Sequence, residues 1–384
     1  MRVAIVTASF PPDVNGIAHQ TWETARQLAL SGHEPLVVAP ARPPARCAGE
    51  APEAFDGCRA PVIRLPTLPS PLPGHPARRP PLPGGRLARA LAAHRPHVVH
   101  LAASGRLGAR GLAAAARLGV PAVALHLAGA PDRNALRPAA AEAAAWRRAR
   151  ALHRAAARTL APSTEAVRAL ADHGVPGALL WPPGVDTERF HPDRRDLELR
   201  HALAPGGELL VGYAGRLVPA KRLDLLAPVC ALPGVRLVLA GDGPSAAALR
   251  TALPGARFLG CRRGGDLARI LASLDVFVHP GRRESFCHTV QEALASGVPV
   301  IAPAVGGPAD LVRHARTGLL VRPDDARALA EAVVTLQTRR RQRADYGLAA
   351  RASALTRTWA AAVDELLGHY GEVVVRGPRV RAGG

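Results

Sequence analysis

Two positively charged residues at short spacing are the first candidates for chemistry in this chain. Arg216 and Lys221 lie five residues apart in Gly212-Tyr-Ala-Gly-Arg-Leu-Val-Pro-Ala-Lys-Arg222, directly after an apolar run that predicts a buried strand. Lys221 is the only lysine among 50 basic residues, and an ammonium does not replace a guanidinium freely at a tight phosphate site. Two cations fixed there would clamp a diphosphate and stabilise the charge that builds on it as it departs. The alternative is a pair of solvated surface residues.

Two glutamates form a second candidate pair. Glu284 and Glu292 lie in Pro280-Gly-Arg-Arg-Glu-Ser-Phe-Cys-His-Thr-Val-Gln-Glu-Ala, where Ser285 is the predicted N-cap of a helix. Glu292 would then lie about 12 Å beyond Glu284, a span similar to that of a sugar–diphosphate–ribose. Glu284 would hold sugar hydroxyls, Glu292 the ribose diol, and the helix N-terminus between them would face the phosphates. The donor-binding residues expected at this helix start are Phe286, Cys287 and His288.

Glycines follow the first strand of each half of the chain. Gly215 ends the strand before Arg216, and Asn15-Gly16 lies between an apolar run and a helical pattern. A residue without a side chain lets the backbone approach a phosphate at a helix N-terminus, so both glycines are candidate donor contacts. A lone Asn-Gly is more often an ordinary turn, and that alternative stays open.

Alternating strand and helix patterns must position these residues. The expected strands are 3–7, 35–39, 62–65, 98–101, 122–125, 159–161, 209–214, 235–240, 256–259, 276–279, 298–302 and 319–321. Helices are expected at 17–30, 87–93, 110–118, 139–157, 329–337 and 351–369. The pattern predicts an α/β protein with two Rossmann-like domains, 1–178 and 179–350, and ligands in a cleft at the carboxyl ends of the strands. Residues 374–384 are expected to form a basic tail, and 66–83 an extended Pro-rich segment on the acceptor side.

Composition narrows the class of partner. The formal charge of +20 suits nucleic acid, anionic lipid or a phosphorylated ligand, but aromatic residues make up only 3% and no nucleic-acid-binding module is recognisable, so we do not expect nucleic acid as a partner. No uninterrupted apolar run of about 18 residues and no signal-peptide pattern occurs, which predicts a cytoplasmic protein. The cysteines are odd in number and widely spaced: Cys47, Cys58, Cys230, Cys261 and Cys287. They are expected to be reduced thiols, and no metal site is expected.

In order and spacing, these motifs resemble glycosyltransferase family four. The resemblance in the second half rests on Gly215-Arg-Leu-x-x-x-Lys221, Leu239-Ala-Gly-Asp-Gly243, the 284–292 segment, Gly297-Val-Pro-Val, Gly306-Gly-Pro and Thr317-Gly-Leu-Leu-Val. In the first half it rests on Phe10-Pro-Pro-x-x-Asn-Gly, Val98-Val-His and Leu160-Ala-Pro-Ser163. The segments 184–192 and 286–297 look most like the actinobacterial GDP-mannose-dependent α-mannosyltransferases that build glycolipids.

The resemblance implies the two-domain GT-B architecture and a metal-independent sugar transfer with retention of anomeric configuration. It implies that Arg216 and Lys221 bind the donor phosphates, Glu284 the transferred sugar and Glu292 the ribose. It also implies that the last helix, 351–370, packs back on the first domain around Trp359. A nucleotide diphosphate sugar would be the substrate, with GDP-mannose favoured, and no separate cofactor is implied.

The acceptor side departs from the family pattern. His126 stands in Ala124-Leu-His-Leu-Ala-Gly129, one position earlier than the histidine that family members usually carry. It is either a catalytic contact to the sugar or acceptor, or an ordinary strand-end histidine.

Several alternatives stay open at this stage. The acceptor would be a lipid or another small hydroxyl compound, and Arg78-Arg79 with Arg147-Arg148 suggest association with the anionic inner face of the plasma membrane. The other functions considered are a sugar-nucleotide epimerase of the same fold and a binding protein without activity. An epimerase would need acid and base groups converging on a sugar C–H, and the sequence offers none beyond Glu284.

Overall fold

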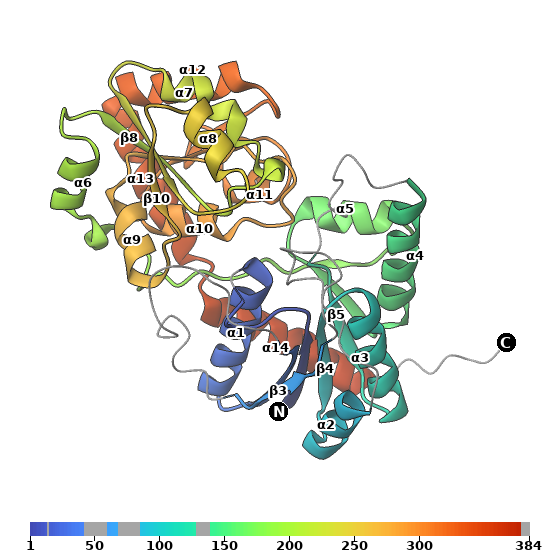
Figure 1. The fold of residues 1–384 in the computed structure, drawn as a ribbon. Helices are drawn as coiled ribbons and strands as arrows, with labels where there is room; N and C mark the ends of the chain where they lie inside the picture. Colours follow the sequence, from blue (N-terminus) through green and yellow to red (C-terminus); the bar gives the residue numbers. More distant parts are fainter. Residues whose placement is uncertain (14, 42–59, 68–84, 128–138, 378–384) are drawn as a thin grey trace. The chain divides into compact units, whose positions relative to one another are not determined.

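The computed structural model describes residues 1–13, 15–41, 60–67, 85–127 and 139–377. These residues form two compact units, one within 1–183 and 359–377, the other 184–358. Each unit is built around one parallel sheet (Figure 1).

The first unit contains a seven-stranded sheet with the order β3-β2-β1-β4-β5-β6-β7. Its strands are β1 (Arg2–Thr7), β2 (Glu34–Pro40), β3 (Val62–Leu65), β4 (Val98–Ala102), β5 (Ala122–Leu125), β6 (Arg158–Ala161) and β7 (Leu179–Leu180). Its helices are α1 (Gly16–Leu30), α2 (Arg86–His94), α3 (Gly105–Arg117), α4 (Ala139–Ala155), α5 (Thr164–Asp172) and α14 (Trp359–Arg376). Parallel strands need crossover helices, which is why the helices alternate with the strands.

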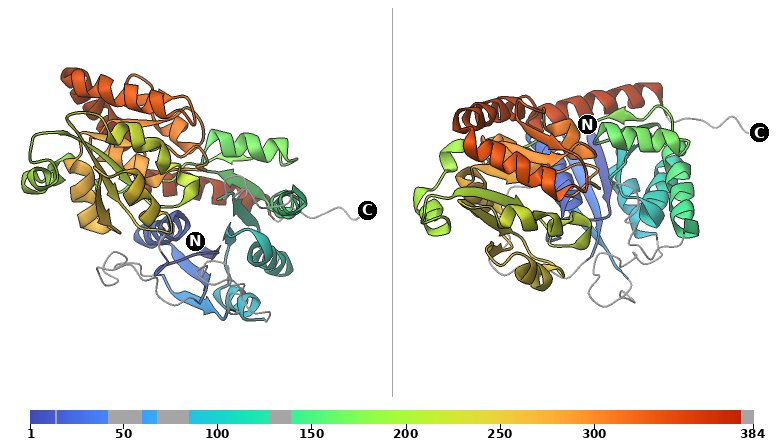
Figure 2. Two further views of the ribbon diagram at one scale, coloured as in Figure 1. Left: turned by 45° about the horizontal axis from the view of Figure 1, so that its top comes forward. Right: turned by 90° about the horizontal axis from the view of Figure 1, so that it is seen from above.

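Alternation along β1 divides the core of this unit between the two faces of the sheet. Val3 and Ile5 pack in one cluster with side chains of α1 and α14. Ala4 and Val6 pack in another with side chains of α2, α3 and α4. Figure 2 shows α2, α3 and α4 following one another along their face of the sheet. Both faces are therefore covered, as a fully parallel sheet requires.

The last helix of the chain, α14, is anchored to this first unit beside α1 and β4 (Figures 1 and 2). The buried Tyr370 hydroxyl lies 2.7 Å from Nδ1 of His100 on β4. The indole N–H of Trp181 donates to the Ala362 carbonyl at 2.8 Å. Residues more than 180 positions apart are thus joined by buried polar contacts.

The second unit contains a six-stranded sheet with the order β10-β9-β8-β11-β12-β13. Its strands are β8 (Leu209–Ala214), β9 (Val235–Ala240), β10 (Arg257–Gly260), β11 (Val276–Val278), β12 (Val300–Pro303) and β13 (Gly318–Val321). Its α-helices are α6 (Leu197–Leu203), α7 (Ala227–Cys230), α8 (Ala246–Ala252), α9 (Gly264–Ser273), α10 (His288–Ala295), α11 (Gly307–Leu311), α12 (Ala326–Thr338) and α13 (Arg340–Leu355), and its 3-10 helices are η3 (Pro192–Arg194), η4 (Pro219–Lys221) and η5 (Leu223–Leu226).

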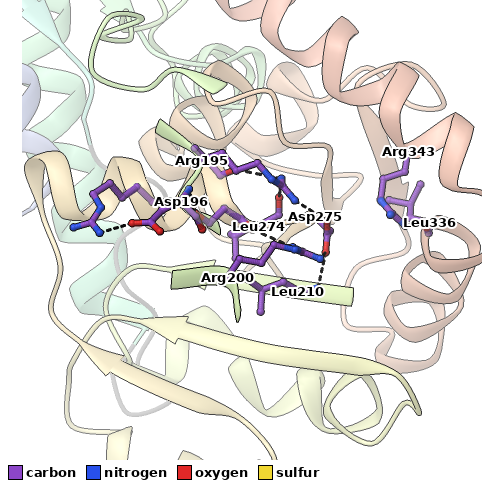
Figure 3. Close-up of polar contacts among 11 residues, drawn as sticks. Arg195, Asp196, Arg200, Leu210, Leu274, Asp275, Leu336 and Arg343 are labelled. Carbon is purple, nitrogen blue, oxygen red and sulfur yellow. Dashed lines mark hydrogen bonds and ion pairs between the residues drawn. The ribbon is translucent and has the colours of Figure 1, made fainter. Parts of the chain in front are cut away.

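A buried carboxylate joins the amino ends of the central strands of this sheet. Asp275, which precedes β11, accepts from the backbone N–H of Leu210 on β8 at 2.8 Å and from Arg200 at 2.7 Å. Arg195 lies 3.5 Å from its other oxygen (Figure 3). The amino ends of β8 and β11 are thereby held in register, and the loops that follow these strands leave from the opposite edge.

The structure confirms most of the expected strands and helices and corrects the pattern in several places; for example, α5 was not expected, and α13 begins at Arg340. The helix expected over 351–370 is two helices, α13 and α14, because residues 356–358 leave the helical conformation between them. Residues 374–376, expected in the tail, continue α14, where Val373 is buried. The two-residue strand β7 was not expected. Several features considered in the sequence lie outside the described residues. They are the Pro-rich segment beyond Thr67, Arg78-Arg79, Cys47, Cys58 and residues 378–384.

None of the described helices combines the length and the apolar character needed to cross a membrane.

Candidate functional site

Most of the residues predicted to bind a phosphorylated ligand lie in the second unit, after the carboxyl ends of β8 and β11. These two strands pair directly at the centre of the sheet. Close backbone contacts hold the neighbouring loops together: a Cβ at Gly241, after β9, would lie 1.8 Å from the Gly215 carbonyl oxygen. A Cβ at Gly307, after β12, would lie 2.5 Å from Cα of Phe286. Glycine is required at both positions because the space is filled by backbone.

Lys221 and Glu284 meet in an ion pair between these loops. Lys221 ends η4, and its Nζ donates to Oε1 of Glu284. The side chains are 19% and 13% exposed, so the pair is largely shielded from water but reachable. Burial alone would raise the pKa of Glu284, but His279 and the Lys221 charge outweigh it and lower this pKa to about 2. Glu284 is therefore a carboxylate over the whole physiological range.

His279 completes the cluster, although the sequence pattern predicts only that it ends a strand. It follows β11 directly, is 1% exposed, and places Nε2 3.2 Å from Oε1 of Glu284 and Nδ1 3.7 Å from Sγ of Cys287. The contact with Glu284 is an ion pair whose alignment does not make a regular hydrogen bond. Burial acts to lower the pKa of His279, but Cys287 and Glu284 raise it to about 9. A polar residue at the carboxyl end of a central parallel strand was the available signal.

Tyr213 supports both sides of this cluster from β8. Its ring stacks on that of His279 with centroids 5.9 Å apart, and its hydroxyl donates to the Arg216 carbonyl at 3.1 Å. Gly215 has φ +146°, and a Cβ there would lie 2.8 Å from the Tyr213 oxygen. The backbone of Arg216 is thus fixed, while its guanidinium is exposed and makes no ion pair within the described residues.

Glu292 is the second predicted carboxylate and lies inside α10. It is 7% exposed, and its Oε2 is buried without a hydrogen-bond partner among the described residues. Burial raises its pKa to about 7, while Arg189 acts to lower that pKa and Asp186 to raise it. A buried acceptor without a donor costs free energy, so this oxygen suits a ligand hydroxyl.

The start of α10 differs from the prediction. The N-cap is Cys287, not Ser285, and no side chain caps the helix. The helix begins at His288 because the chain from Glu284 to Phe286 is held in a loop against the 306–307 turn, where the N–H of Gly307 donates to the Glu284 carbonyl at 2.7 Å. The rings of Phe286 and His288 meet edge to face at 5.1 Å. The side chain of the N-cap residue, Cys287, thus accepts no hydrogen bond from the first turn of α10.

The charge environment of Cys287 follows from the same neighbours. Burial acts to raise the pKa of this thiol, but the His279 charge outweighs it and lowers the pKa. Within the described part of the chain, Cys230, Cys261 and Cys287 form no disulfide, in agreement with the expected reduced thiols.

The remaining predicted site residues lie in the first unit. Asn15 is the N-cap of α1, and its side-chain oxygen accepts from the N–H of Ala18 at 3.0 Å, so Asn15-Gly16 starts a helix rather than forming a simple turn. Gly16 is exposed at the first position of α1. His126 follows β5, is 6% exposed and stacks on Trp146 with centroids 5.8 Å apart. Its Nδ1 lies 3.4 Å from Nε2 of His153.

The structure thus joins Lys221 to Glu284 directly and places Arg216 and Cys287 on the loops around them. His126 and Gly16 belong to the other unit. Within the described part of the chain, no three His, Cys, Asp or Glu side chains are grouped so that they could hold a metal ion.

Comparison with known proteins gives consistent matches over both halves. Residues 14–189 match the family described as Glycosyltransferase Family 4, and residues 208–339 match Glycosyl transferases group 1. The chain is 46% identical over 380 residues to a GDP-mannose-dependent alpha-mannosyltransferase of Mycolicibacterium smegmatis, covering 98% of each chain. It is 46% identical over 389 residues to the protein of the same name from Mycobacterium tuberculosis, covering 99% of this chain and 98% of the relative.

Among solved structures, the fold is similar to that of Anabaena HepE in complex with UDP. The TM-score is 0.79, over 97% of this chain and 100% of HepE, at 21% sequence identity. This likeness concerns the fold, and it confirms the expected α/β class with two Rossmann-like sheets of the GT-B type.

Proposed function

The chain belongs to glycosyltransferase family 4 and is a glycosyltransferase, and from this we propose that it transfers mannose from GDP-mannose to a hydroxyl acceptor. Its relatives at 46% identity carry the name GDP-mannose-dependent alpha-mannosyltransferase. The epimerase and the inactive binding protein are not favoured by these relatives.

The observation that carries the proposal is the cation pair beside a fixed carboxylate at the carboxyl edge of the second sheet. Arg216 has an exposed guanidinium on a fixed backbone, and Lys221 has an ammonium held by Glu284. When the bond from the sugar to the diphosphate breaks, negative charge builds on the departing oxygens. Cations close to the departing oxygens stabilise that charge, and this supports a transfer that needs no metal ion. Retention of anomeric configuration is proposed because the chain belongs to this family.

The two carboxylates divide the rest of the donor between them. Glu284 is charged and accepts hydrogen bonds from hydroxyls of the transferred mannose. Glu292, whose Oε2 has no donor among the described residues, accepts from the ribose diol. Gly215, Phe286, Cys287 and His288 shape the backbone between these positions, where the N–H groups at the start of α10 suit an anionic phosphate. Gly16 remains a candidate donor contact, and His126 remains a candidate contact to the transferred sugar or the acceptor.

For the acceptor, we propose a lipid at an anionic membrane surface on the cytoplasmic side. The helix α4 carries exposed Arg147, Arg148, Arg150 and Arg154, against the single acidic residue Glu142. Anionic headgroups attract such cations by about 1 kcal/mol each near the surface. This patch supports peripheral membrane association.

The test of the donor is a calorimetric titration of the metal-free protein with GDP, UDP, ADP and NAD, repeated with Lys221→Ala. We expect GDP to bind, and to bind more weakly in the variant. Binding of UDP in preference to GDP would overturn the choice of donor, and the absence of binding by any nucleoside diphosphate would overturn the proposed function. Transfer is then measured as the release of GDP from GDP-mannose in the presence of lipid extract.

A further inference from the structure

Glu284 is held by one oxygen only. Both cations of the cluster, Nζ of Lys221 and Nε2 of His279, lie on its Oε1. Within the described residues no hydrogen bond reaches Oε2. Since the side chain is 13% exposed, the second oxygen is the part of this carboxylate that remains for a ligand hydroxyl.

The two cations on Oε1 are not equivalent. Lys221 has a side chain that is 19% exposed, whereas that of His279 is 1% exposed. A diphosphate that binds Lys221 competes with Glu284 for its ammonium, because both are anions. His279 cannot move toward the diphosphate as Lys221 does, because its ring lies between Tyr213 of β8 and the start of α10. Its Nδ1 is 3.7 Å from the Cys287 sulfur.

We propose, on the basis of the function above, that His279 is a positioning residue for sugar transfer. It anchors Oε1 of Glu284 when Lys221 engages the donor phosphates, so that Oε2 stays directed to hydroxyls of the transferred hexose. Gly281 leaves the space for this contact: a Cβ there would lie 3.0 Å from Nε2 of His279 and 3.4 Å from Oε1 of Glu284.

The charge on His279 follows from the groups that face it. Glu284 lies on the Nε2 side, Cys287 on the Nδ1 side, Tyr213 against the ring, and Lys221 across Glu284. Because its pKa is raised to about 9, the imidazole is cationic at neutral pH and loses its charge as the pH rises through about 9. The anchor on Glu284 should weaken over the same range.

Two substitutions distinguish the contact that His279 makes through Nε2 from the one that it makes through Nδ1. Glutamine places its amide nitrogen near the position of Nε2, and asparagine places its own near Nδ1. In His279→Gln the contact with Glu284 is kept, and in His279→Asn only the contact with Cys287 is kept. We expect H279N to lower kcat for GDP-mannose by about tenfold or more, and H279Q to stay within about threefold of wild type.

GDP binding gives the required contrast, because GDP lacks the sugar. Its Kd should change less than about threefold in both variants. A wild-type rate in H279N, or equal losses in H279N and H279Q, would overturn the positioning role. His100→Asn is the control for loss of a buried histidine, since His100 is 2% exposed and bonded to Tyr370 in the other unit. Thermal unfolding of each variant shows whether it is folded.

A second measurement does not depend on turnover. The ring signals of His279, assigned in NMR spectra by their absence in H279N, should titrate near pH 9 in wild type and at lower pH in Glu284→Gln. Titration near the ordinary histidine value of about 6.5 in wild type would contradict the proposal even if donor and acceptor were misassigned. If His279 titrates as expected but the protein does not use GDP-mannose, the proposed function is wrong, whereas the ion pair between His279 and Glu284 is supported.

Discussion

Lys221 and Glu284 are 63 positions apart in the sequence and form an ion pair between the loops that follow β8 and β11. The pairing of those two strands at the centre of the sheet brings the loops together. The cation proposed to bind phosphate and the carboxylate proposed to bind the sugar are therefore coupled in the structure without a ligand. Replacing either residue should affect the binding or transfer of the donor and leave the fold intact.

Substitution of Lys221 tests the phosphate role. Lys221→Ala removes one of two cations and should reduce turnover of GDP-mannose at least about tenfold, a loss of about 1.4 kcal/mol in transition-state stabilisation. Glu284→Ala should reduce turnover by a similar factor while GDP affinity changes little. Arg327→Ala is the charge-matched control, because Arg327 is 89% exposed on α12 and pairs only with Glu331 within the described residues. Steady-state rates as in wild type for both K221A and E284A would contradict the mechanism.

Glu292 makes GDP binding depend on pH. Its pKa is raised by burial to about 7, and the carboxylate accepts hydrogen bonds from a ribose diol better than the protonated acid does. Binding should therefore favour the deprotonated form, so that affinity rises as the pH increases through about 7. Calorimetry at several pH values measures this slope.

Glu292→Gln is the comparison for that experiment. GDP has a terminal phosphate that titrates near pH 6, so only the difference between wild type and E292Q reports on Glu292. We expect the variant to bind GDP more weakly and with a smaller dependence on pH. An identical pH dependence in the two proteins would remove Glu292 from the ribose site.

Gly281 should tolerate no side chain without a functional cost. In Gly281→Ala the new methyl group would contact His279, Glu284 and Lys221, at 3.0, 3.4 and 3.4 Å from their nearest atoms. The ion pair between His279 and Glu284 must then widen, which should lower kcat several-fold. Gly265→Ala is the matched control, because nothing lies within 4 Å of a Cβ at that position. If G281A and G265A have the same rate, the space beside His279 is not required.

The basic face of α4 should bind anionic membranes. Arg147→Glu with Arg148→Glu is expected to reduce sedimentation with phosphatidylglycerol vesicles, and high salt should release the wild-type protein because exposed charges are screened. The double variant Arg340→Glu, Arg341→Glu carries the same change in charge on exposed positions of α13. Equal loss of binding in both double variants would indicate an effect of net charge alone. Retention of wild type at high salt would indicate hydrophobic insertion instead.

Much of the fold could be predicted from local sequence. Apolar runs bounded by glycine and proline placed β5, β8 and β9 at their observed bounds, because buried parallel strands need continuous apolar residues. Lys221 was recognisable as a candidate because it is the only lysine in the chain, and Glu284 because of its spacing from Glu292. The break at 356–358 between α13 and α14 was missed, since the helical pattern on its two sides is continuous in composition.

What the sequence by itself determined was the α/β class and the family, together with the candidate donor-side residues, because these depend on periodicity and on motifs within a short stretch of chain. Only the tertiary structure decided that His279 and Lys221 share one oxygen of Glu284, that Cys287 rather than Ser285 precedes α10, and that Glu292 has a buried oxygen without a donor among the described residues. The physical reason is that these properties come from strand order and loop packing. They depend on which segments meet across the sheet, and spacing along a single chain does not encode that directly.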